Sequence, residues 1–63
     1  MWEQGDCKEH LKKGERFEIF MLVSSGGAQL LDKGTSELSR KIKNFKSVRA
    51  AKIAAAKWAY RSA

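Results

Sequence analysis

The chain has 63 residues, with 13 Lys and Arg against 7 Asp and Glu, a formal net charge of +6 and a single Cys. A chain of this length holds at most one compact domain, and one thiol cannot form an internal bridge, so a multidomain enzyme and a disulfide-held mini-protein are both excluded. We expect a single domain over residues 1–63 and a reducing, cytoplasmic location. We also expect a homodimer, because so small a core gives only marginal stability by itself.

The charge is distributed unevenly along the chain. Residues 1–37 carry all seven acids and five bases, whereas residues 38–63 carry eight bases and no acid. An unopposed run of cations attracts polyanions, although it can also be a solvated face that keeps a small protein soluble. The longest apolar run, residues 19–23, is far shorter than the roughly 20 residues of a membrane span. The expected partner is therefore nucleic acid or an acidic protein surface, with no membrane span.

The N-terminal segment predicts a helical turn or two. Asp6 is a candidate N-cap with Glu9 three residues later, which approximates a capping box. Gly14 is expected to end this helix over residues 6–13. Whether residues 1–14 are ordered is left open.

Cys7 and His10 stand three residues apart and on a helix could face one metal ion. Zinc takes four ligands, or three and a water, so one chain offers half a site and a dimer would have to supply the rest. A plain surface pair is the simpler interpretation. No third group for nucleophilic catalysis accompanies the pair, so we expect no metal, no cofactor and no enzymatic activity.

Residues 16–25 fit either a strand or a helix. Phe17, Ile19, Met21 and Val23 alternate as in a half-buried strand, but the apolar residues from Phe17 onward also recur at helical spacing. A strand needs a partner, and no second candidate strand is evident. The strand alternative is therefore an intermolecular β-ribbon from residues 16–24 of two chains, which resembles the ribbon-helix-helix dimers in outline.

Gly26 and Gly27 separate this segment from residues 28–34, a short predicted helix that Gly34 would end as a C-cap. Together with the basic segment that follows, it has the outline of a helix-turn-helix. Positions that the standard motif keeps apolar fall on cations, which argues against it: Lys33, Arg40 and Lys43.

Residues 36–60 predict a long basic helix. Good helix formers dominate it, neither Gly nor Pro interrupts it, and Thr35 or Ser36 can cap its first turn. The expected fold is all-α, with two or three helices packed as a helical hairpin or small bundle around this helix.

On that helix, spacing at 100° per residue places one apolar stripe around Arg49 and a second, shallower face on Val48, Ala51, Ala55 and Trp58. The stripe joins apolar residues of the preceding segments to form the predicted dimer or core face: Phe17, Phe20, Met21, Leu31, Leu38, Ile42, Phe45, Ile53 and Tyr60.

The remaining side of the helix alternates cations with small residues, and Trp58 stands beside two cations, as is typical where nucleic acid is bound. We therefore expect a non-enzymatic, small basic accessory or regulatory protein, of a kind typical of phages and mobile elements, that binds nucleic acid through phosphate contacts of its C-terminal helix. The alternative is an interaction module or inhibitor that docks this helix on an acidic partner protein. The predicted contact residues are Lys41, Lys43, Lys46, Lys52, Lys57, Trp58 and Arg61.

Overall fold

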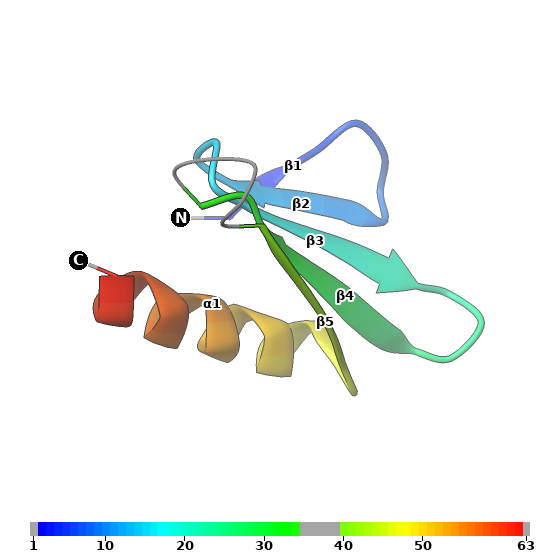
Figure 1. The fold of residues 1–63 in the computed structure, drawn as a ribbon. Helices are drawn as coiled ribbons and strands as arrows, with labels where there is room; N and C mark the ends of the chain where they lie inside the picture. The colour runs from blue at the N-terminus through cyan, green and yellow to red at the C-terminus, as the bar shows by residue number, and fades with distance from the viewer. Residues whose placement is uncertain (1, 35–39, 63) are drawn as a thin grey trace.

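In the part of the chain that the structure describes, an antiparallel sheet of five strands is followed by one helix (Figure 1). The structure is a computed structural model that describes residues 2–34 and 40–62, with side chains described as far as residue 60. Each strand pairs with the next one along the chain, in the order β1-β2-β3-β4-β5. The elements are β1 (Glu3–Gln4), β2 (His10–Lys13), β3 (Phe17–Leu22), β4 (Gly27–Asp32), β5 (Lys41–Phe45) and α1 (Val48–Ser62).

The prediction of an all-α, helical protein is wrong. Residues 6–13 form a turn and β2, and residues 28–34 contain most of β4 in place of the predicted short helix, which also removes the helix-turn-helix outline. Gly14, which was expected to end a helix, and Gly26 lie in the turns between strands, where each has a positive φ. Pairing between distant segments therefore overrides the local helical spacing.

The intermolecular β-ribbon is wrong as well. Ile19 of β3 lies opposite Leu11 of β2 on one side and Leu30 of β4 on the other, so β3 is paired on both edges within one chain. The other strands resemble helices in composition, because β2 and β5 are rich in lysine and β4 contains alanine, glutamine and leucine, all of which are good helix formers.

The long helix predicted for residues 36–60 begins much later, at Val48. The backbone N–H of Ala50 donates to Oγ of Ser47 at 3.1 Å, and the N–H of Ala51 donates to the Ser47 carbonyl at 3.2 Å, so Ser47 is the N-cap. The candidate caps Thr35 and Ser36 lie outside the described residues.

Helix α1 covers one face of the sheet, in contact with β3, β4 and β5 (Figure 1). The buried core joins the two layers and consists of Phe17, Ile19, Ala28, Leu30, Ala51 and Ala55. Ala51 and Ala55 have no exposed surface, and their small side chains bring the helix backbone close to the strands. Helix α1 is neither long enough nor apolar enough to cross a membrane.

The helix face that meets the sheet is the shallower one of Val48, Ala51, Ala55 and Trp58. Of the residues predicted for a dimer or core face, Phe17 is buried, Met21, Leu31 and Phe45 are partly buried, and Leu38 lies outside the described residues. The other members are exposed to different degrees: Phe20 by 36%, Ile53 by 50%, Ile42 by 63% and Tyr60 by 86%. A dimer contact through these exposed residues stays a prediction.

Candidate nucleic-acid interface

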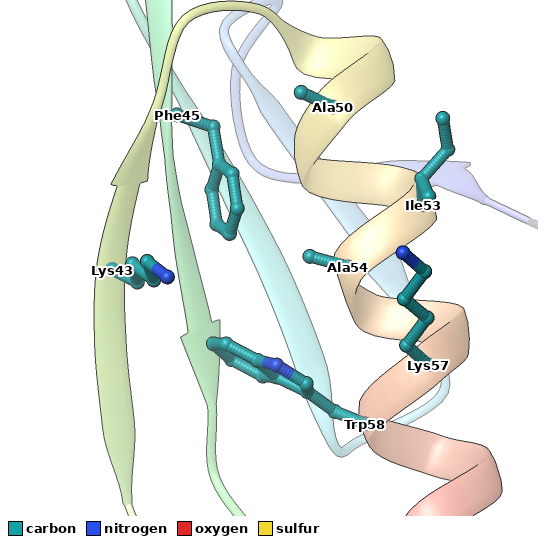
Figure 2. A pocket seen from close by; sticks show the side chains of 7 residues that line it. All are labelled: Lys43, Phe45, Ala50, Ile53, Ala54, Lys57 and Trp58. Atoms are coloured by element: carbon teal, nitrogen blue, oxygen red, sulfur yellow. The ribbon is translucent and has the colours of Figure 1, made fainter.

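A groove lies between the edge strand β5 and helix α1 (Figure 2). Its volume is about 360 Å³. Lysines, aromatic rings and small apolar side chains line it together: Lys43, Phe45, Ala50, Ile53, Ala54, Lys57 and Trp58. We call this feature the β5–α1 groove.

The strand side of the groove follows from the alternation of β5. Lys41, Lys43 and Phe45 share one face because successive side chains of a strand point to opposite faces. Lys43 lies opposite the core residue Leu30, which places this face on the side of the sheet that α1 covers. The side chains at positions 41, 43 and 45 are thereby directed toward the helix, as Figure 2 shows for Phe45.

The helix side of the groove is built from residues one turn apart. Ala50 and Ala54 are directed toward the strand, and Trp58, one turn further on, extends its indole in the same direction (Figure 2). Ile53 and Lys57 stand on the outer rim of the helix. Alanine at positions 50 and 54 therefore keeps the groove open where a larger side chain would fill it.

Cations border the aromatic rings of the groove. The Lys41 Nζ lies 6.0 Å from the Trp58 ring centroid, and the Lys43 Nζ lies 5.7 Å from the Phe45 ring centroid. The Phe45 and Trp58 rings are 6.4 Å apart and inclined at 56°. This geometry combines positive charge with two aromatic surfaces in one place.

The buried acids take their partners from the N-terminal part of the chain. Glu18 pairs with His10 and with Lys33 at 2.8 Å each, and Asp32 pairs with Arg16 at 2.8 Å. The hydrogen bond from Lys33 lowers the pKa of Glu18, and the one from Arg16 lowers the pKa of Asp32, in both cases against the opposing effect of burial.

The basic C-terminal part is left without such partners. Among the residues that the structure describes, no ion pair joins a carboxylate to any cation between residues 40 and 57, a set made up of Arg40, Lys41, Lys43, Lys46, Arg49, Lys52 and Lys57. Lys41 contributes a weaker, longer-range attraction to Asp32. The positive charge of residues 40–57 is therefore not neutralised by ion pairs within the described residues.

The predicted contact residues come together in part. Lys43, Lys57 and Trp58 line the groove, and Lys41 lies beside it. Lys46 is exposed in the turn between β5 and α1, and Lys52 is partly buried on the helix. Arg61 belongs to α1, but its side chain lies outside the described part of the chain.

Phe45 and Ile53 line the groove, although helical spacing had placed both on the dimer or core face. For Phe45, the spacing of a strand instead puts it with Lys41 and Lys43. The alternation of lysine and aromatic residues at positions 41, 43 and 45 was the signal that could have shown it.

Cys7 and His10 are not the plain surface pair that the sequence favoured, because His10 is buried. The His10 Nε2 is 2.8 Å from Glu18 Oε1, and its Nδ1 accepts a hydrogen bond of 3.2 Å from the Asp6 backbone N–H, while Cys7 is exposed. Within residues 2–34 and 40–60 no three His, Cys, Asp or Glu side chains gather as metal ligands would.

The β5–α1 groove can thus bind a ligand that carries negative charge and planar groups, because lysines pair with anions and aromatic rings stack on flat ones.

Protein families, curated proteins and solved structures were compared with this chain, and none of them matched.

Proposed function

We propose that the protein binds nucleic acid through phosphate contacts made by β5 and α1. The observation that carries this proposal is the group of cations between residues 40 and 57 that form no ion pair with a carboxylate within the described residues. Some of these cations stand beside the aromatic rings of the β5–α1 groove.

Phosphate recognition suits this arrangement on physical grounds. Lys43 and Lys57 are exposed and come from opposite sides of the groove, so a phosphate backbone that follows the groove meets positive charge from both elements. Each neutralised phosphate releases condensed counterions, and the affinity then depends steeply on salt. Contacts of this kind carry little sequence information, which fits an accessory or regulatory role without catalysis.

The test is a fluorescence anisotropy titration of labelled DNA at salt concentrations between about 50 and 300 mM, where phosphate contacts have their strongest effect. We expect log affinity to fall linearly with log salt, and the double variant Lys43→Gln/Lys57→Gln to reduce the slope on duplex DNA by about 0.9 for each phosphate that is no longer neutralised. The charge-matched control is Lys8→Gln/Lys12→Gln, in the N-terminal part, which should leave the slope unchanged. Absence of binding at about 50 mM salt would reject the proposal.

A second candidate function is docking on an acidic protein. Strand β5 stands at the edge of the sheet and leaves one row of backbone N–H and C=O groups without a strand partner in the described chain. An extended acidic segment could add to this edge beside Lys41 and Lys43. Recovery of one defined protein from a nuclease-treated extract, together with absence of DNA binding, would favour this function over the first.

A further inference from the structure

We propose that the β5–α1 groove receives an unstacked nucleobase, so that the protein prefers single-stranded nucleic acid to a duplex. This inference rests on the proposed function, because it assumes that phosphates are already bound by the surrounding lysines. Beyond the proposed function, it states that a base enters the groove and that single strands are therefore preferred to duplexes.

The aromatic wall of the groove supports the insertion of a flat group. Phe45 and Trp58 come from the strand and the helix, and their inclination of 56° makes an angled surface in place of a closed stack. Figure 2 shows both side chains extending into the space between the two elements. A base that enters there contacts an aromatic ring, and base–aromatic stacking tolerates any sequence because every base has a flat face.

The size of the groove fits the same ligand. Its volume of about 360 Å³ lies at the lower end of the range of small-molecule sites, which begins near 300 Å³. Ala50 and Ala54 line it without filling it. A single base is a ligand of this scale, whereas a whole duplex has to stay outside.

The lysines are placed for the phosphates on either side of such a base. Lys43 lies on the strand and Lys57 on the helix, and Lys41 Nζ stands 6.0 Å from the Trp58 ring centroid. Charge at both rims and aromatic rings inside are the two features of sites that bind single strands. A base in a duplex is paired and stacked, so it would have to be extruded at a cost of a few kcal/mol before it could enter.

The experiment compares a labelled single strand of about 12 nucleotides, a length within the site sizes known for such proteins, with a duplex of the same length and salt. The variants are Trp58→Leu, which removes the ring, Trp58→Phe, which keeps one, and Ala54→Leu, which narrows the groove. The folding of each variant is checked by circular dichroism and thermal unfolding. In a Trp2→Phe background Trp58 is the one tryptophan left in the chain, and its fluorescence reports directly on the groove.

We expect the single strand to bind at least about 10-fold more tightly than the duplex and to quench the Trp58 fluorescence. Trp58→Leu should weaken single-strand binding by about 5- to 150-fold with little effect on the duplex, Ala54→Leu should act in the same direction, and Trp58→Phe should restore most of the affinity. If Trp58→Leu unfolds the chain, Ala54→Leu and the quenching of Trp58 still decide the question.

Three results would overturn the inference. The first is a duplex affinity equal to or higher than the single-strand affinity, with both affinities lowered by Lys43→Gln/Lys57→Gln. This result would support the proposed function but reject the base site. Binding of poly-glutamate as tightly as the single strand would show that charge alone is recognised. No binding of either nucleic acid would reject the proposed function and this inference together.

Discussion

His10 and Glu18 are joined by a hydrogen bond of 2.8 Å between Nε2 and Oε1, and both residues are buried. Because Nδ1 of His10 accepts a hydrogen bond from the Asp6 N–H, the ring proton sits on Nε2 and is donated to Glu18. The other Glu18 oxygen pairs with Lys33 Nζ at 2.8 Å. This network ties the loop before β2 to β3 and to the end of β4, on the sheet face opposite α1.

Loss of the Glu18 charge should destabilise the fold. Glu18→Gln keeps the size of the side chain but removes the ion pair with Lys33, and we expect a decrease of about 2 kcal/mol in the free energy of unfolding at neutral pH, as for other hydrogen bonds to charged groups. Urea denaturation measures the decrease. Glu3→Gln is the matched control because Glu3 is exposed. Equal effects of the two variants would contradict the role given to the network.

The stability of the protein should fall in acid because of Glu18 and Asp32. Hydrogen bonds from Lys33 and Arg16 lower the pKa of these two carboxyls below their ordinary values in the folded chain. A lowered folded pKa contributes stability that is present above the unfolded pKa, about 4, and is lost as the pH falls through the folded value.

Denaturation curves between about pH 7 and pH 2.5 test this, since that range begins above the unfolded pKa values of the two carboxyls and ends below them. We expect the free energy of unfolding to decrease below about pH 4. Asp32→Asn and Glu18→Gln should each flatten that decrease. A wild-type curve with no decrease in acid would refute the assignment.

The sequence could predict the division of charge but not the strands that carry it. The local composition of β5, with Lys41 and Lys43 beside Ile42, fits a helix as well as an edge strand that is exposed on both faces. Its identity depends on pairing with β4, from Asp32↔Lys41 to Ala28↔Phe45, and local spacing does not contain that information.

Treating β5 as part of the helix also shifted the predicted buried face of the helix, and it assigned the residues of the groove to different faces. The apolar stripe was aligned on Ile42 and Phe45, which belong to β5, so Ile53 was placed toward the core although it is half exposed. Lys43, Lys57 and Trp58 were predicted as contact residues on a single helix. They line one groove formed by β5 and α1, which a one-helix interpretation could not have shown, and their part in binding stays a prediction.

The contact between helix and sheet should tolerate little added volume at Ala55. This residue has no exposed surface, whereas its neighbour Ala56 is exposed. We expect Ala55→Leu to lower the free energy of unfolding by about 1–3 kcal/mol through overpacking. Ala56→Leu adds the same side chain at a solvent-facing position and should change stability by less than about 0.5 kcal/mol. Thermal and urea unfolding of the two variants measure the difference, and equal stability would contradict the observed face of α1.

The start of α1 at Val48 can be tested through its cap. Ser47 Oγ accepts from the Ala50 N–H, and the first turn of the helix contains no acid. Ser47→Ala should therefore cost about 1 kcal/mol of stability. Ser47→Asp keeps an acceptor and adds a negative charge at the positive end of the helix dipole, so it should equal or exceed the wild type at low salt and lose that advantage at high salt. The measurement is urea denaturation of the three proteins at two salt concentrations. If α1 instead began near residue 36, as the sequence suggested, Ser47 would lie inside a helix, and Ser47→Ala would stabilise the protein because alanine is the better helix former.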